Sequence, residues 1–166
     1  MERPASREAT SGKEIVMSRI IEGPRRVVFE AYSDPRHLAH WWGPNGFTTT
    51  THSFEFRPGG VWDFTMHGPD GTNYPNRIEW LEITPPERIV FLHGEGEDDP
   101  EMFTSTVTIV ERGDLSEVTL HAAFKTTAQR DQVVEEYQAI EGAEQTLGRL
   151  AGYVATPIEP SGLGGG

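Results

Sequence analysis

The amino-acid sequence predicts an α+β fold in which a twisted antiparallel sheet is wrapped around a long C-terminal helix. Between residues 47 and 124, β-type runs alternate with turn-forming segments, and residues 127–154 carry apolar side chains at helical spacing without a proline. A chain of 166 residues, 36% of them hydrophobic, is the size of one domain with a substantial core. We therefore expect a single folded domain at residues 14–155.

Both ends of the chain lack the pattern of folded elements. Residues 1–13 show no apolar periodicity, and the chain finishes in Gly-Leu-Gly-Gly-Gly. We expect flexible tails at residues 1–13 and 156–166.

The first predicted elements are a strand and two short helices. Residues 15–21 form an apolar β-type run, and Pro24 suits the first turn of a helix, where its missing N–H costs nothing. Asp34 can cap a second helix, Pro35 fits the first position of that helix, and Gly43-Pro44 ends it. Two short helices in series are therefore expected after the first strand.

The middle of the chain predicts an antiparallel meander with one strongly apolar face. Turn signals lie at residues 57–60, 69–71, 85–86, 94–100 and 112–114. Every second side chain of a strand shares a face, so the bulky residues of each run gather on one side. The residues placed on this face are Phe54, Phe56, Trp62, Phe64, Met66, Ile78, Trp80, Phe103, Val107, Val118, Leu120 and Phe124.

The last element is predicted to be one amphipathic helix from Thr127 to Val154. Its apolar residues recur every three or four positions. They are Val133, Tyr137, Ile140, Leu147, Leu150 and Val154.

Several motifs, in this order, resemble the AHSA-type branch (activator of Hsp-ninety ATPase homologues) of the START-like, or SRPBCC, superfamily. They are residues 24–31, Asp34-Pro35, Trp41-Trp42-Gly43-Pro44, Arg57-Pro-Gly-Gly60, residues 66–71, Pro85-Pro-Glu-Arg88 and the helical stretch 141–153. The resemblance implies a helix-grip (START-like) fold with a cavity between helix and sheet. In the wider superfamily this cavity binds lipids, hormones and polyketides, or cyclises and hydrolyses them. Many relatives carry a tryptophan at the position of Ala143 or its neighbour.

The predicted binding site consists of the aromatic face of the sheet and the facing helix. Of the adjacent Trp41 and Trp42, we expect one in the core and one at the pocket mouth; the alternative is that both only hold the short helices to the sheet. A second alternative is that the rings fill the space and leave no cavity. The candidate ligand-binding residues are Trp41, Trp42, His52, Phe54, Trp62, Phe64, Tyr74, Trp80, Phe103, Tyr137, Ile140 and Glu141.

Most catalytic and metal-binding motifs are absent from the sequence. There is no cysteine, no HExxH and no GxSxG, and the histidines closest in sequence are His37 and His40, without a carboxylate at ligand spacing. The acidic loop 95–101 lacks EF-hand spacing and is interpreted as a solvated hairpin tip. We therefore predict no metal, no cofactor and no nucleophilic catalysis.

One acid–base set remains conceivable. His52 shares strand parity with Phe54, so it is predicted to point into the cavity, where Tyr74, Glu82 or Glu141 would approach it. An enzyme resembling polyketide cyclases or aromatases, with His52 or Tyr74 moving a proton, is therefore one alternative function.

The primary interpretation is non-catalytic binding of a small hydrophobic or aromatic molecule, with a chaperone-activating interaction module as a further alternative. The formal charge of −12 disfavours nucleic acid and anionic membranes as partners. No run of about eighteen apolar residues and no signal-peptide pattern occurs, which indicates a cytoplasmic protein. Exposed strands leave a homodimer open.

Overall fold

The computed structural model describes residues 6–8, 12–136 and 138–155. The strands are β1 (Ser6–Glu8), β2 (Glu14–Ile21), β3 (Thr48–Phe54), β4 (Val61–His67), β5 (Asn73–Thr84), β6 (Arg88–Gly94), β7 (Phe103–Arg112) and β8 (Leu115–Ala123). The helices are α1 (Arg25–Tyr32), α2 (Pro35–Trp41), α3 (Thr127–Glu136) and α4 (Ala139–Ala155).

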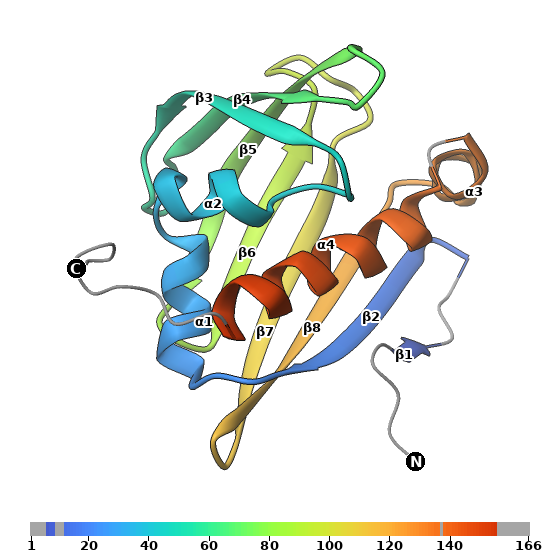
Figure 1. Cartoon of the computed structure of the whole chain (residues 1–166). Helices are drawn as coiled ribbons and strands as arrows, with labels where there is room; N and C mark the ends of the chain where they lie inside the picture. Colours follow the sequence, from blue (N-terminus) through green and yellow to red (C-terminus); the bar gives the residue numbers. More distant parts are fainter. Residues whose placement is uncertain (1–5, 9–11, 137, 156–166) are drawn as a thin grey trace.

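The strands within these ranges form one antiparallel sheet in the order β1-β2-β8-β7-β6-β5-β4-β3. Strands β3 to β8 each pair with the next along the chain, and β2 joins the meander beside β8. Helix α4 lies against one face of the curved sheet, and α1 and α2 lie near one end of it (Figure 1). The predicted fold class is confirmed, and β1 is an additional strand that the sequence did not predict.

The residues that predicted the second short helix, Asp34 and Pro35, begin α2 in the structure. Asp34 is the N-cap of α2 and accepts a hydrogen bond from the Arg36 N–H at 2.8 Å, with Pro35 in the first turn. Trp42 is the C-cap, and Gly43 follows with a φ of 98°, which glycine adopts without a steric penalty. The chain therefore leaves α2 in a sharp turn at residues 42–44.

The prediction of a single helix from Thr127 to Val154 is wrong. Helix α3 ends at Glu136, α4 begins at Ala139, and Gln138 between them has a φ of 52°. Gln129 is the one buried side chain of α3 in the described residues, so little apolar packing holds α3 along the axis of α4. The Gln129 amide instead donates a hydrogen bond to the Glu101 carbonyl at 2.5 Å, which ties α3 to the acidic loop.

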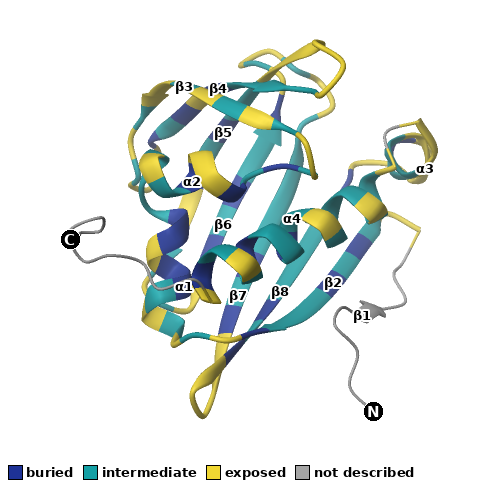
Figure 2. Ribbon diagram, in the orientation of Figure 1, coloured by how far each residue is buried: buried dark blue, intermediate teal, exposed yellow. Residues whose placement is uncertain are grey.

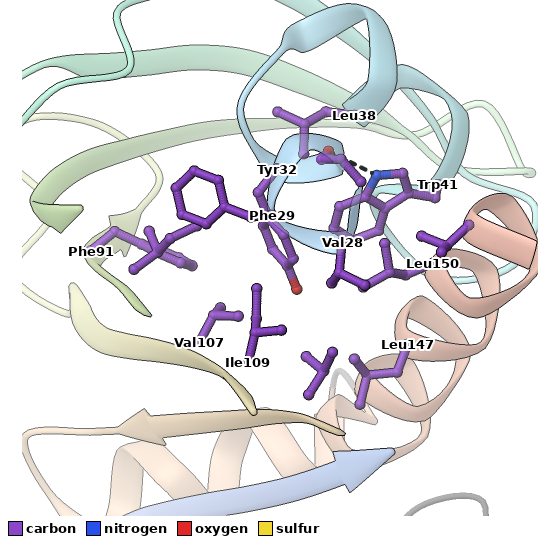
Figure 3. Close-up of a cluster of buried hydrophobic side chains, with 14 of the residues drawn as sticks. Val28, Phe29, Tyr32, Leu38, Trp41, Phe91, Val107, Ile109, Leu147 and Leu150 are labelled. Carbon is purple, nitrogen blue, oxygen red and sulfur yellow. Dashed lines mark hydrogen bonds between the residues drawn. The ribbon is translucent and has the colours of Figure 1, made fainter. Parts of the chain in front are cut away.

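The core lies between the sheet and the helices α1, α2 and α4. Trp41, Trp62 and Trp80 are almost fully buried, with at most 1% of their surface exposed. The Trp41 indole N–H donates to the Ala31 carbonyl at 3.1 Å and so joins α2 to α1 (Figure 3). Buried residues lie on α1 and on the strands beneath α4, whereas α3 is largely exposed (Figure 2). No helix of the described ranges is both long and apolar enough to cross a membrane.

Replacing Leu147 by alanine should lower the free energy of unfolding by about 2–5 kcal/mol, because this fully buried side chain joins α4 to the core. Urea unfolding followed by circular dichroism measures the effect. The matched control is Leu81→Ala, at a leucine that is 42% exposed, which should change stability by less than about 1 kcal/mol. Equal losses in the two variants would contradict the assigned core.

Candidate functional site

A cavity of about 290 Å³ lies between α4 and the sheet, and we call it the inner cavity. Its walls come from β2, β4, β6, β7 and β8, from the ends of α1 and α2 with the turn after α2, and from the first half of α4. Small side chains form the α4 wall, namely Ala139, Gly142, Ala143 and Thr146. Because an apolar cavity of about 150 Å³ already holds benzene, this space is large enough for a substituted ring.

A second hollow of about 500 Å³, the outer hollow, adjoins the inner cavity. It lies among β5, the acidic loop and α3, and it shares Pro44, Met66, His93 and Phe103 with the inner cavity. The same four side chains therefore separate the two spaces. The outer hollow therefore lies next to the inner cavity.

Arg149 of α4 fixes the turn that forms one wall of the inner cavity. Its Nη1 atom donates to the carbonyl oxygens of Trp42, Gly43 and Pro44 at 3.3, 3.0 and 2.8 Å, and its Nη2 atom donates to that of His40 at 3.3 Å. Partial burial lowers the pKa of Arg149. One guanidinium therefore satisfies four carbonyl groups that follow or end α2.

His93 of β6 lines both spaces. The ring lies among aromatic rings, the nearest being that of Phe103 with centroids 5.2 Å apart, and its Nε2 atom is 2.7 Å from the Asn76 Oδ1 atom. Burial lowers the pKa of His93 to about 4, although Asp99 opposes this effect. The imidazole is therefore neutral at pH 7, and because the amide oxygen accepts, Nε2 carries the proton.

Three of the predicted ligand-binding residues line the inner cavity: Trp41, Trp42 and Phe103. Trp41 is 1% exposed and belongs to the core, whereas Trp42 is half-buried at the turn after α2. Both tryptophans therefore line the cavity, Trp41 from the core and Trp42 from the turn.

Four other predicted residues pack beside the cavity instead of lining it. Trp62 and Phe64 stack with centroids 3.8 Å apart, and Phe54 meets Trp62 and Trp80 edge to face at 5.9 and 6.1 Å. These rings fill the space under one half of the sheet. The alternative of a filled interior therefore applies to this half, and the hollow lies under the other.

The prediction that His52 points into the cavity is wrong. The register between β3 and β4 shifts between Thr51 and Ser53, so one extra residue reverses the side-chain alternation. His52 is exposed, and its Nε2 atom is 2.8 Å from the Thr65 Oγ1 atom on the outer face.

The acid–base set proposed around His52 is not assembled. Tyr74 lines the outer hollow and is 38% exposed, and Glu82 contacts Thr84 and Arg88. Glu141 is exposed in the first turn of α4. Within the described residues, no hydrogen bond or ion pair joins any two of these four side chains.

The two remaining predicted residues belong to the C-terminal region. Ile140 packs against the core and does not line either space. Tyr137 lies outside the described residues.

The sequence reasoning missed the polar residues of the inner cavity, among them Tyr32, His93 and Ser105. Each carried a periodic signal. His93 and Ser105 share strand parity with Phe91 and Val107, and Tyr32 follows Val28 by one helical turn. They were overlooked because only large apolar side chains were assigned to the inner face of the sheet.

A curved antiparallel sheet that wraps a C-terminal helix and encloses a cavity defines a helix-grip domain. Residues 22–155 match the family described as activator of Hsp90 ATPase homolog 1-like protein, and the chain belongs to this family. No curated protein matches the chain.

Solved structures share the fold. A protein from Arthrobacter aurescens is similar over 92% of both chains, with 21% identity and a TM-score of 0.84. A protein from Mycobacterium smegmatis has 25% identity and a TM-score of 0.76, over 85% of this chain and 90% of that one. An AHSA1 protein from Silicibacter pomeroyi has 20% identity and a TM-score of 0.71, over 86% and 97% of the respective chains.

Arg149→Lys should lower the free energy of unfolding by about 1–3 kcal/mol, because an ammonium group cannot reproduce the four hydrogen bonds of the guanidinium. Amide hydrogen exchange should also accelerate at residues 42–46. The control, Arg57→Lys at an exposed ion pair with Glu55, should cost less than about 1 kcal/mol. Unchanged stability and unchanged exchange in Arg149→Lys would contradict the role of Arg149 in holding the turn after α2.

The His93 imidazole should remain neutral as the pH falls to about 5 in the folded protein and should protonate near 4. The unfolded chain protonates it near 6.5. Between pH 6.5 and 4 the unfolded chain binds this proton and the folded protein does not. The free energy of unfolding therefore keeps its full value above pH 6.5 and falls by about 3 kcal/mol as the pH drops from 6.5 to 4. NMR titration of this imidazole, with the urea-unfolded protein as control, measures both midpoints. A folded-state midpoint at about 6 or higher would contradict the buried position.

Proposed function

We propose that the protein binds a small hydrophobic or aromatic molecule in the inner cavity and does not transform it. The observation that carries this proposal is the cavity itself, which is walled mainly by apolar side chains and adjoins the outer hollow. Concave apolar sites with a few convergent polar groups are the usual form of small-molecule sites.

The hydrophobic effect alone supplies enough energy for such binding. A ring compound that buries about 300 Å² of apolar surface gains roughly 7 kcal/mol at about 25 cal/mol per Å². The costs of association reduce this gain, so micromolar affinity is the upper limit for a ligand without polar contacts.

The positions of the titratable groups favour binding over catalysis. The candidate acid–base set is dispersed, with His52 on the outer face and Glu141 exposed on α4. Among the described residues, His93 is the one titratable side chain that borders both spaces, and its proton is engaged with Asn76. His121 lines the inner cavity alone, and its Nε2 atom is paired with Glu14 at 3.4 Å. Proton transfer to a substrate needs a group with a suitable pKa within hydrogen-bond reach, and the dispersed residues do not provide one.

Ala143→Trp should abolish ligand binding while the domain stays folded, because the indole would occupy the cavity from the α4 wall. Native mass spectrometry of the freshly purified protein, compared with its denatured mass, shows whether a molecule travels with the chain. We expect an additional mass on the wild type and none on Ala143→Trp.

The matched control is Ala128→Trp, at an exposed alanine of α3 that lines neither space. This variant should retain the additional mass, and thermal unfolding should show that both variants are folded. A wild-type protein that carries no additional mass and also fails to bind neutral aromatic probes would overturn the proposed function.

A further inference from the structure

The Tyr32 hydroxyl belongs to a residue of the inner cavity wall and has no hydrogen-bond partner among the described residues. Tyr32 is the last residue of α1, is 2% exposed and lines the inner cavity. Its ring packs edge to face on Trp41 with centroids 4.8 Å apart, within the buried cluster drawn in Figure 3. In the described part of the chain, no group accepts from or donates to its oxygen. Because no protein group uses this hydroxyl and its residue lines the cavity, the hydroxyl is suited to bond a ligand.

Ser105 supplies a second hydroxyl on the cavity wall. It lies opposite Phe91 of β6 and Ala122 of β8, both of which also line the cavity. Among the residues described, its hydroxyl has no hydrogen-bond partner either. The Thr146 hydroxyl differs, because it donates to the Gly142 carbonyl at 2.8 Å and is satisfied within α4.

No lysine or arginine belongs to the described lining of the inner cavity. Of its two histidines, His93 is kept neutral at pH 7 by burial, and the His121 Nε2 atom already lies 3.4 Å from a Glu14 carboxylate oxygen. The outer hollow is lined by four carboxylates and by no lysine or arginine. These carboxylates belong to Glu95, Asp99, Glu101 and Glu136. An anionic ligand would therefore be repelled on approach and left without a counter-charge inside.

We infer that the inner cavity selects a neutral, single-ring molecule with a hydrogen-bond acceptor, such as an aryl ketone, and that the Tyr32 hydroxyl donates to this acceptor. The inference rests on the proposed function and adds the chemical class of the ligand and the residue that selects it. Tyr32 is suited to donate because burial raises the pKa of its phenol, which keeps the proton in place. A ligand without an acceptor would leave the hydroxyl unpaired. The loss of binding free energy from an unpaired hydroxyl is larger than the loss from a missing apolar contact.

The test compares acetophenone with α-methylstyrene, in which a methylene group replaces the carbonyl oxygen at nearly unchanged shape, and with benzoate. Dissociation constants are measured by calorimetry at pH 7 for the wild type and for Tyr32→Phe. We expect Tyr32→Phe to weaken acetophenone about tenfold and to change α-methylstyrene by less than about twofold. Benzoate should bind the wild type at least about tenfold more weakly than acetophenone.

Tyr153→Phe is the matched control, because the Tyr153 hydroxyl contacts His37 Nδ1 at 2.6 Å and lines neither space. It should leave the affinities for both neutral probes unchanged. Infrared spectroscopy of bound acetophenone adds a reading that needs no variant, since a donated hydrogen bond shifts the carbonyl stretch to lower frequency. We expect this shift in the wild type and its loss in Tyr32→Phe.

Equal weakening of both neutral probes by Tyr32→Phe, an unshifted carbonyl band, or benzoate binding as tight as that of acetophenone would overturn the inference. If neither neutral probe binds while the wild type still carries a co-purified mass that Ala143→Trp lacks, the inference fails and the proposed function stands. Absence of both probe binding and co-purified mass overturns the two together.

Discussion

The packing of α4 against the concave face of the sheet decides where this protein is solid and where it is hollow. In the second half of the helix, Leu147, Leu150 and Val154 are buried and fill the space above the strands. In the first half, Ile140 packs against the core, but the residues that line the inner cavity are alanine, glycine and threonine. The cavity is thus a consequence of small side chains on a helix that is held in place by large ones further along.

The same helix also determines the shape of the entrance. Arg149 lies between Leu147 and Leu150, so the contacts that fix α4 also fix the guanidinium that binds the carbonyl groups after α2. The turn at residues 42–44, which a glycine with positive φ makes possible, is thereby attached to α4. Movement of α4 would displace two walls of the cavity at once.

The sequence contained the fold but only part of the site. Strand alternation and helix capping are local properties, so the meander and α2 were predictable from residues such as Asp34 and Trp62. The β-bulge at His52 and the positive φ at Gln138 could not be predicted from periodicity alone. The bulge reverses the side-chain alternation of β3, and the positive φ interrupts the helix predicted from Thr127 to Val154. Whether a cavity forms depends on the side-chain volumes of segments that are far apart in the sequence, such as those of Phe91 and Ala143. The pattern within one segment does not predict that sum.

The apolar cavity is itself an argument about function. Side chains that line a cavity forgo the packing contacts of a filled interior, which costs stability. A larger side chain at Ala143 would remove much of this cost by simple substitution, and the aromatic cluster around Trp62 shows that the other half of the same sheet is filled. Tyr32 and Ser105 place hydroxyl groups without partners among the described residues on the wall of this cavity. A bound ligand would supply both the missing packing contacts and the missing hydrogen bonds, and it would thereby stabilise the folded protein.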